Sequence, residues 1–295
     1  MQSQETPPAV VEQEKSQVKE IANLSDNDKV TLNDSGWDSR VYVINDGQYI
    51  IKFPRSEKIR ARYSSQIKAL ELASGIISGV TVPKVLWQDP YYRYFGYAGI
   101  AGLPLAKVLP ELDSATKEHI GEVLGYFLSQ FHQLRLEDAR LMSIDQEIIQ
   151  VQDWYQKGLN LTGKFFTTEE QNRLDTLVYD IWPSQLNSLG GSKKLCHGDF
   201  HFDNIFYSQN TGVGVIDFGD VCKADPSKDF ADFSDNLIFE AAIKSYGSDD
   251  NKLRDKIRLR EEMTRIITMT AQLMKHDNQA AKETIANIKE SFRLF

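Results

Sequence analysis

The chain has 295 residues, 41% of them hydrophobic and 26% charged, which is enough for a sizeable core and excludes a disordered or fibrous protein. Its formal net charge is -8, so neither a nucleic acid nor an anionic membrane is the expected partner. The start MQSQETPP has no basic, apolar leader, no stretch reaches the roughly 20 apolar residues of a spanning helix, and Cys196 and Cys222 lack metal or disulfide spacing. We therefore expect a cytoplasmic protein with two buried free thiols.

The N-terminal part of the sequence predicts a small antiparallel sheet with one helix. Residues 1–25 are rich in Gln, Glu, Ser and Pro and are expected to form a flexible tail or a short exposed helix. Beyond them, Asp46-Gly47 separates two β-branched and aromatic runs, which is a strong hairpin signal. The predicted strands span residues 41–44, 49–53, 80–87 and 91–100, and the predicted helix spans roughly residues 56–73.

Beyond Gly102-Leu-Pro104 the pattern becomes mainly helical. One helix face is formed by apolar residues at helical spacing, namely Ile120, Val123, Leu124, Phe127, Leu128, Phe131 and Leu134. Residues 145–190 and 235–295 also read as helices, whereas short strands and loops are expected between Leu195 and Phe230.

These patterns predict a bilobal α+β protein. After the tail of residues 1–25, an N-lobe with the sheet and its helix would span residues 26–102, and a helical C-lobe with the reactive loops would span residues 103–295. Ligand sites usually lie in clefts between lobes, so we expect the functional site there.

Two neighbouring motifs in the C-lobe carry the strongest chemical signal. His197-Gly-Asp-Phe-His-Phe-Asp-Asn204 is followed by Val215-Ile-Asp-Phe-Gly219, which brings Asp199, Asn204 and Asp217 into one short stretch. Phosphoryl transfer from a nucleotide needs a carboxylate that orients or deprotonates the attacking hydroxyl, and oxygen ligands that hold Mg²⁺ against the phosphates. An Asp followed five residues later by Asn, and then by Asp-Phe-Gly, is the spacing of protein-kinase-like catalytic centres.

Two other interpretations of this stretch remain open. Asp and Asn in a glycine-bearing loop are commonly turn residues without a catalytic role. His197 and His201 are four residues apart, as in the helix of zinc metalloproteases. However, Gly198 follows the first His, Asp199 is one carbon shorter than the Glu of that motif, and no third ligand is evident.

Lys52 and Gly36 are the candidate nucleotide contacts of the N-lobe. Lys52 lies in the apolar run Tyr-Ile-Ile-Lys-Phe-Pro, where an ammonium is costly unless an anion meets it, although an edge-strand lysine could face water instead. Alternation puts Ile51 and Phe53 on the other face of this strand. Gly36 is the one glycine of the segment 33–39, whose backbone N–H groups could cover a phosphate or simply form a turn.

Together these residues resemble the aminoglycoside phosphotransferase family of kinase-like enzymes, most closely its 2''-aminoglycoside phosphotransferase branch. The resemblance runs from about Leu32 to about Phe233. Its motifs are Gly36-Trp-Asp-Ser39, Tyr49-Ile-Ile-Lys-Phe-Pro-Arg55, Val82-Pro83, Gly102-Leu-Pro-Leu105, Phe131-His132, His197-Gly-Asp199, Asn204, Ile216-Asp-Phe-Gly-Asp220, Asp225-Pro226 and Asp229-Phe230. The resemblance implies a protein-kinase-like fold, with a small antiparallel β N-lobe and a larger, mainly helical C-lobe.

The resemblance also implies a role for each candidate residue of the reaction centre. Asp199 would be the catalytic base, Asn204 and Asp217 would be Mg²⁺ ligands, and Lys52 would contact the phosphates of ATP or GTP. Asp225 and Asp229 look like the family's structural acids, which would brace the catalytic loop by binding backbone N–H groups.

At the base end of the nucleotide, Gly99 and Ile100 fall where the family's hinge backbone contacts the purine, and Tyr97 falls at the gatekeeper position. One departure concerns the N-lobe helix, where Gln66 stands in place of the Glu that normally pairs with the strand lysine. Gln66 could accept a hydrogen bond from Lys52, and Glu71 is the alternative partner.

The resemblance implies a small-molecule O-phosphotransferase of the kind associated with antibiotic resistance, acting as a monomer or weak dimer. Asp232, Asp235 and Glu240 could form an anionic lip for a polycationic aminoglycoside, or simply the polar face of a helix. Related enzymes phosphorylate choline, homoserine or macrolides, so the acceptor stays open. A non-catalytic nucleotide-binding module and a protein kinase are the alternatives, although the short segment between Asp-Phe-Gly and Asp225 disfavours the latter.

Overall fold

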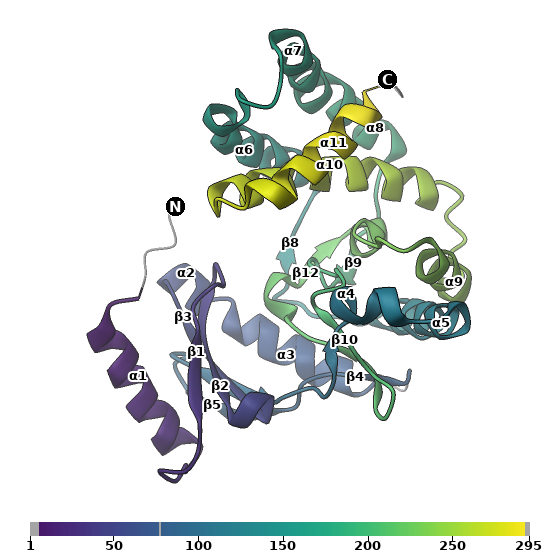
Figure 1. The fold of residues 1–295 in the computed structure, drawn as a ribbon. Coiled ribbons are helices and arrows are strands. Elements are labelled where there is room, and N and C mark those ends of the chain that lie inside the picture. The colour runs from purple at the N-terminus through teal and green to yellow at the C-terminus, as the bar shows by residue number, and fades with distance from the viewer. Residues whose placement is uncertain (1–5, 77, 293–295) are drawn as a thin grey trace. The chain divides into compact units, whose positions relative to one another are not determined.

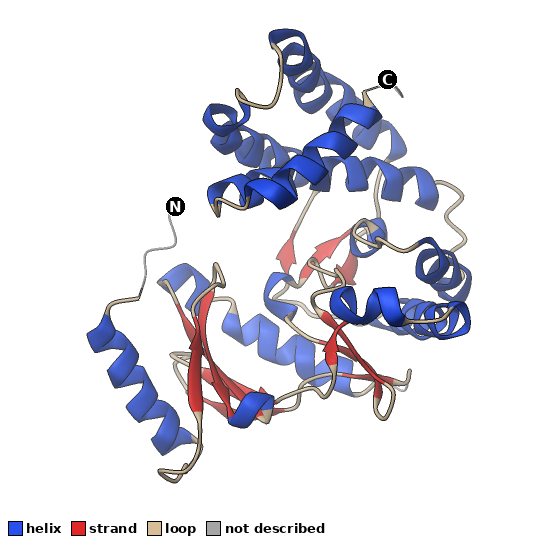
Figure 2. Cartoon of the chain, viewed as in Figure 1, coloured by secondary structure: helices blue, strands red, loops and turns tan. Residues whose placement is uncertain are grey.

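The computed structural model describes residues 6–76 and 78–292, which form two compact units of mixed α and β structure (Figures 1 and 2). The first unit contains residues 6–139, 199–221 and 234–246, and the second contains residues 140–198, 222–233 and 247–292. The first unit thus extends past residue 102 and includes two later segments of the chain. Among the described helices, none has the length and apolar character needed to cross a membrane.

The first unit is built on a five-stranded antiparallel sheet. Its strands, in spatial order, are β1 (Val30–Asn33), β2 (Ser39–Ile44), β3 (Tyr49–Pro54), β6 (Phe95–Ala98) and β5 (Val85–Gln88). The predicted hairpin joins β2 to β3, and Asn45, Asp46 and Gly47 all take the positive φ values that such a tight turn demands. The turn fixes a register in which Val41 faces Lys52.

Alternation along β3 separates the two faces of this sheet. Ile51 and Phe53 belong to a buried apolar cluster with Tyr42 and Val18, whereas Lys52 points to the opposite face. On that opposite side lie the short helix α2 (Glu57–Arg60) and α3 (Tyr63–Ser74). The predicted alternation of β3 is thus confirmed.

Of the two expectations for the N-terminal segment, a flexible tail or a short exposed helix, the structure shows a helix, and this helix is docked on the sheet. Residues Pro8–Ile21 form the helix α1, in which Glu14 and Val18 lie one turn apart on the same face and are buried. Val18 packs against the apolar face of the sheet, while the Glu14 carboxylate accepts hydrogen bonds from Arg40 and from the hydroxyl of Tyr42. The sparse apolar residues of this helix hid these contacts from a composition-based prediction.

A second, four-stranded sheet completes the first unit together with three helices. Its strands, in spatial order, are β4 (Val80–Thr81), β11 (Gly212–Val215), β10 (Ile205–Ser208) and β7 (Leu103–Pro104). The helices are α4 (Leu105–Val108), α5 (Ser114–Phe131) and α9 (Asn236–Tyr246). Asp113 caps α5 through the N–H of Thr116, and α5 packs closely along α9.

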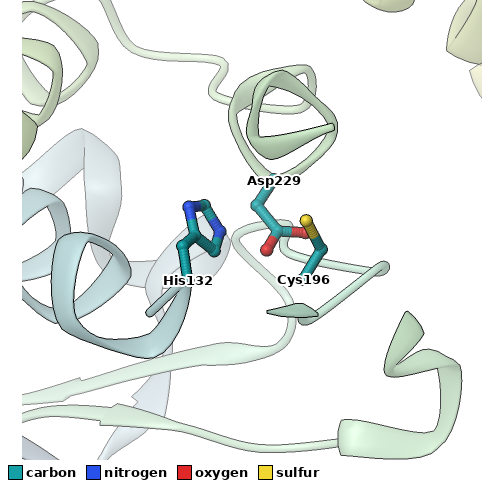
Figure 3. A group of neighbouring side chains, drawn as sticks. All are labelled: His132, Cys196 and Asp229. Carbon is teal, nitrogen blue, oxygen red and sulfur yellow. The ribbon is translucent and has the colours of Figure 1, made fainter. Parts of the chain in front are cut away.

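The second unit is mainly helical, as expected for this part of the sequence. Its helices are α6 (Ile144–Thr162), α7 (Thr168–Thr176), α8 (Trp182–Leu189), α10 (Leu253–Met274) and α11 (Asn278–Ser291), with a π-helical turn over Leu177–Ile181. A small sheet of β8 (Arg140–Leu141), β12 (Cys222–Ala224) and β9 (Lys194–Cys196) carries the two cysteines. Both thiols are free and buried, as predicted. Burial, assisted by the nearby carboxylate of Asp229, raises the pKa of Cys196 well above its ordinary value (Figure 3).

Candidate active site

The first unit brings Lys52 of β3 against Asp217, which follows β11. The Lys52 ammonium lies 2.9 Å from Asp217 Oδ1, and Lys52 is only 6% exposed whereas the Asp217 side chain is 43% exposed. Burial disfavours the charged ammonium, but the carboxylate of Asp217 outweighs it, so the pKa of Lys52 lies above its ordinary value. The lysine is therefore a fixed positive charge beside a half-exposed carboxylate.

Asp199 and Asn204 lie in the loop that leads into β10. The Asn204 amide Nδ2 donates to Asp199 Oδ2 and to the Asp199 carbonyl, each at 3.0 Å. These bonds join the two ends of the segment 199–204. The main-chain N–H of Ile216, next to Asp217, donates to the Asn204 carbonyl at 2.9 Å. The three predicted polar residues of the two motifs are thus tied together by adjoining segments of one unit.

The zinc-protease alternative does not fit this loop. Residues 197–204 contain no helix, so the two histidines cannot share one helix face as that motif requires. His201 Nε2 instead lies 3.1 Å from Asn204 Nδ2 and 3.5 Å from Asp199 Oδ2. His201 therefore supports the loop that carries Asp199.

The oxygen atoms of Asn204 and Asp217 fit a magnesium ion chemically. Because the Asn204 Nδ2 group is bound to Asp199, its amide oxygen is turned elsewhere, and it accepts no hydrogen bond from any described residue. Asp217 takes a left-handed backbone conformation, with φ 60° and ψ 66°, which is uncommon for a residue with a side chain. An amide oxygen and a carboxylate are the hard donors that Mg²⁺ prefers.

Gln66 and Glu71 do not take the place expected for a partner of Lys52. Gln66 lies buried in α3, but among the described residues the hydrogen-bonding partner of the Lys52 ammonium is Asp217. The Gln66 amide instead lies next to Gly219, about 4 Å from where a β-carbon of that glycine would be. Glu71 is exposed on α3. Neither Gln66 nor Glu71 therefore pairs with Lys52, whose ammonium binds Asp217.

Gly99 and Ile100 follow β6 as a connecting segment. The Gly99 N–H donates to the Gln48 carbonyl at 2.9 Å, and a β-carbon at Gly99 would lie 1.7 Å from the Gly47 carbonyl oxygen, so only glycine allows this approach. The side chain of Ile100 rests on Gly214 of β11. These two residues border a cavity of about 240 Å³ whose other walls come from Thr81, Ala101 and residues 211–214 at the start of β11.

Tyr97, at the expected gatekeeper position, is buried in β6. Its pKa is raised by burial, although the neighbouring Lys52 acts in the opposite direction. The phenol therefore stays neutral near pH 7 and lies close to the Lys52 ammonium.

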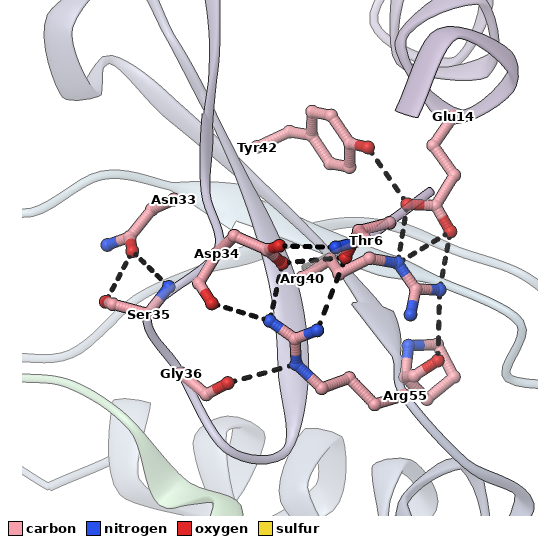
Figure 4. A network of polar contacts seen from close by, with 10 residues as sticks. Thr6, Glu14, Asn33, Asp34, Ser35, Gly36, Arg40, Tyr42 and Arg55 are labelled. Atoms are coloured by element: carbon pink, nitrogen blue, oxygen red, sulfur yellow. Dashed lines mark hydrogen bonds and ion pairs between the residues drawn. The ribbon is translucent and has the colours of Figure 1, made fainter. Parts of the chain in front are cut away.

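Gly36 lies in the loop between β1 and β2, which the side chain of Arg55 holds from one side (Figure 4). A β-carbon at Gly36 would approach the Ser39 carbonyl oxygen to 3.2 Å, so the turn is tight there. The sequence analysis did not include Arg55 among the candidate site residues. It named Arg55 only as the last residue of the motif that contains Lys52. A second arginine, Arg62, lies 3.4 Å from the Asp38 carboxylate and 3.7 Å from that of Asp220.

Asp225 and Asp229 have the structural role that the resemblance implied. In the second unit, the Asp229 carboxylate accepts from the N–H groups of His197 at 2.7 Å and Gly198 at 2.8 Å. Asp225 accepts from the N–H of Ser192 at 2.9 Å and that of Ser227 at 3.1 Å. Both acids therefore satisfy backbone donors at the start of the catalytic motif and around it, as predicted.

The three acids proposed for the acceptor are not gathered in one unit. Asp232 belongs to the second unit, whereas Asp235 and Glu240 belong to the first. Asp235 forms an ion pair with Lys117 at 2.9 Å and accepts from the N–H groups of Leu237 and Ile238, which caps α9. Asp235 thus has a structural function, while Glu240 lies exposed on α9.

Several solved structures are similar to this chain in fold. The GDP and kanamycin complex of APH(2")-IIia matches with a TM-score of 0.76 at 17% identity, covering 94% of this chain and 97% of that one. The streptomycin-ATP-APH(2")-IIa ternary complex matches with a TM-score of 0.67 at 18% identity, covering 98% and 99%. A choline/ethanolamine kinase family protein from Mesorhizobium loti matches with a TM-score of 0.65 at 15% identity, covering 94% of each chain.

These similarities confirm the predicted kinase-like α+β fold. No curated protein sequence is significantly similar to the chain. The model of the phosphotransferase enzyme family, however, matches residues 29–258, which is most of the sequence and includes every predicted catalytic residue. The chain belongs to the phosphotransferase enzyme family.

Proposed function

We propose that the protein transfers the γ-phosphoryl group of ATP or GTP to a hydroxyl of a small molecule, with an aminoglycoside as the first candidate acceptor. The observation that carries this proposal is the meeting of Lys52 and Asp217 at 2.9 Å, beside a loop in which Asn204 clamps Asp199. A family that transfers phosphoryl groups needs this set of charges and oxygen donors.

In the proposed reaction, Asp199 orients the acceptor hydroxyl and takes its proton as the bond to phosphorus forms. The acceptor oxygen bonds to the γ-phosphorus, and the bond from that phosphorus to the β,γ-bridging oxygen breaks. The electron pair of the broken bond stays on the bridging oxygen, which leaves as part of ADP or GDP. Catalysis then consists mainly of positioning and charge neutralisation. Asn204 holds the Asp199 carboxylate in place, since it donates to Oδ2 at 3.0 Å.

Asn204 and Asp217 would hold Mg²⁺, and the unbound amide oxygen of Asn204 supports this assignment. The ion, when bound, supplies positive charge next to the donor phosphates. Lys52 would bind the phosphates from the other side, and its raised pKa keeps it charged over the working pH range. When nucleotide enters, the Asp217 carboxylate is exposed enough to exchange its bond to Lys52 for other partners.

The purine would lie against the segment that contains Gly99 and Ile100. The Gly99 N–H is already bound to Gln48, whereas the N–H of Ile100 donates to no acceptor in the described part of the chain. This leaves Ile100 as the free donor for a ring nitrogen of the base. Because similar structures contain GDP in one case and ATP in another, both donors are proposed.

The acceptor proposal rests on the net charge of the chain and on the solved structures to which the chain is similar. An acidic protein, with a net charge of -8, attracts a polycationic acceptor such as an aminoglycoside. Similar structures bear names that include kanamycin, gentamicin and streptomycin, and one is a macrolide 2'-phosphotransferase from Brachybacterium faecium. Within the first unit, Glu240 remains a proposed acceptor contact, whereas Asp235 is engaged with Lys117.

The experiment is a screen of nucleoside diphosphate release. The purified chain would be supplied with Mg²⁺ and either ATP or GTP, and with aminoglycosides, macrolides, choline-like amines or amino alcohols in turn. We expect release of ADP or GDP that depends on an added hydroxyl compound, with a matching gain of one phosphoryl group in its mass. Nucleotide binding without release for any acceptor would contradict the proposal and identify a non-catalytic binding module.

A further inference from the structure

The loop between β1 and β2 is bound at three carbonyl groups by a single residue, Arg55 (Figure 4). The Arg55 guanidinium donates from Nε to the Gly36 carbonyl at 3.0 Å and from Nη2 to the Asp34 carbonyl at 2.7 Å. The main-chain N–H of Arg55 donates to the Asp38 carbonyl at 2.9 Å. Three alternate carbonyls of the loop are thereby fixed to one point at the end of β3.

The same guanidinium connects this loop to the chain ahead of α1. Arg55 Nη2 lies 2.5 Å from Asp34 Oδ1, and the Asp34 carboxylate also accepts from the main-chain N–H of Thr6 at 3.1 Å and from the Thr6 hydroxyl at 2.9 Å. Thr6 is buried, and Arg55 and Asp34 are both mostly shielded from water. Charge-assisted bonds in such a setting hold their geometry better than exposed ion pairs do.

Three backbone carbonyl groups of this loop are therefore bound, whereas, within the described part of the chain, the N–H groups of two of its residues are not. Its carbonyls at Asp34, Gly36 and Asp38 are turned to Arg55, while the N–H groups of Gly36 and Asp38 donate to no described residue. Backbone N–H groups that converge in a turn bind anions, and they bind best when the turn is already in shape. With only one glycine, this loop depends on an external brace for that shape.

From this geometry we propose that Arg55 is a positioning residue for the nucleotide phosphates. Together with Asp34 and Thr6, it holds the loop over residues 33–39 so that the N–H groups of Gly36 and Asp38 meet the triphosphate. Thr6 would then act on the nucleotide only indirectly, through Asp34 and Arg55. This inference rests on the proposed function, because it assigns the loop to the donor nucleotide.

The test measures ligand affinity of the full-length chain by isothermal titration with Mg²⁺ present. The probes are ATP, GTP, inorganic tripolyphosphate and adenosine, and the variants are Arg55→Gln and Arg55→Lys. Arg93→Gln is the matched control, since it breaks an ion pair with Asp89 at another turn of the same sheet. We expect Arg55→Gln to lower the affinity for ATP, GTP and tripolyphosphate about tenfold and to leave the affinity for adenosine unchanged. Arg93→Gln should bind all four probes as the wild type does.

Lysine keeps the charge but cannot reach both Asp34 and Gly36, so Arg55→Lys should recover less than half of the loss on a logarithmic scale. Unchanged affinity for the phosphate-bearing probes, or an equal loss for adenosine, would overturn the inference. If Arg55→Gln does not fold, Thr6→Val removes only one hydroxyl donor, and a loss of about twofold to threefold confined to those three probes is then the expected result; no loss would overturn the inference. The titrations measure binding and not turnover. A wild type that binds the phosphate-bearing probes but phosphorylates no acceptor would therefore contradict the proposed function and leave this inference standing.

Discussion

A buried ammonium facing a half-exposed carboxylate is the most unusual feature of the site at the scale of single residues. Removing one partner of a fully buried ion pair is strongly destabilising, because the remaining charge cannot be hydrated. In this pair Asp217 retains access to water, while Lys52 is enclosed by Tyr63, Tyr97 and the sheet. We therefore expect the pair to contribute more to ligand binding than to stability.

Lys52→Met is predicted to separate these two effects. The substitution replaces a buried charge with an apolar side chain of similar length and leaves Asp217 hydrated, so the free energy of unfolding should change by less than about 1 kcal/mol. Turnover should fall on the order of 100-fold because the phosphates lose their fixed cation. Urea unfolding and initial rates measure both quantities, with the exposed Lys84→Met as control. A large loss of stability with normal turnover would contradict this assignment.

A second prediction at this scale concerns Asp89, whose side chain is 3% exposed. The Arg93 guanidinium, which donates to both of its carboxylate oxygens, lowers the pKa of Asp89 from 3.8 to about 2 despite burial, and the backbone N–H groups of Tyr91 and Arg93 assist. Because the folded-state pKa is depressed, the stabilisation is complete above pH 3.8 and is lost as the pH falls toward 2.

Asp89→Asn should therefore lower the free energy of unfolding by about 2 kcal/mol at pH 7, and the difference from wild type should shrink below pH 4. Urea unfolding between pH 3 and pH 7 measures this dependence. The exposed Asp26→Asn serves as control and should show no such trend. A difference that stays constant over the whole range would show that the carboxylate charge is not responsible.

The sequence allowed the reactive residues to be predicted by type and spacing, but not their partners. Asp199, Asn204 and Asp217 follow from a motif whose members are close along the chain. The pairing of Lys52 with Asp217 instead of Gln66, and of Asp235 with Lys117, depends on side chains far apart in sequence. Such pairs are set by tertiary packing, which a local pattern does not encode.

At the scale of elements, the contact between α5 and α9 depends on glycine. A β-carbon at Gly125 would lie 2.1 Å from the Ala242 carbonyl oxygen, and one at Gly121 would lie 2.3 Å from that of Ile238. Both glycines therefore allow the backbones of the two helices to approach closely. The predicted apolar face of α5 is confirmed, but the close packing of α9 against Gly121 and Gly125 was not predicted from the sequence.

Gly125→Ala is predicted to destabilise the protein by about 3 kcal/mol, because the added methyl group meets backbone atoms that cannot move without displacing α9. Gly163→Ala is the matched control. Gly163 has helical φ and ψ, and an added β-carbon would meet nothing within 4 Å, so this change should be neutral or stabilising by about 0.5 kcal/mol. Thermal unfolding of the two variants compares them directly, and equal effects would contradict the packing argument.

The elements with a local signature were predicted well, and those without one were not. The Asp46-Gly47 turn of the β2–β3 hairpin is recognisable in the sequence, and the hairpin forms as predicted. Helix α1 was expected to be a flexible tail or a short exposed helix, and its docking on the sheet was not predicted, since its buried Glu14 is recognisable only once Arg40 and Tyr42 of β2 are in place. A charged residue that docks a helix looks, in sequence alone, like a surface residue.

At the scale of the whole chain, the order of segments and the compact units do not coincide. The predicted lobes followed the change from strand to helix patterns near residue 102. The first compact unit contains residues 199–221 and 234–246 as well as the N-terminal part of the chain, so it contains Lys52, Asp199, Asn204 and Asp217 together. Discontinuous units arise from long-range contacts, so a linear change of composition cannot reveal them.

The most direct test of the central claim is a single-turnover measurement on Asp199→Asn with Mg²⁺, γ-labelled ATP or GTP, and an acceptor that the wild type phosphorylates. We predict that nucleotide affinity stays within about twofold of wild type, while label transfer to the acceptor falls at least about 1,000-fold, because the group that takes the hydroxyl proton is lost. Asp203→Asn, an exposed neighbour in the same loop, should transfer label at close to the wild-type rate. Label transfer by Asp199→Asn at the wild-type rate would contradict the account.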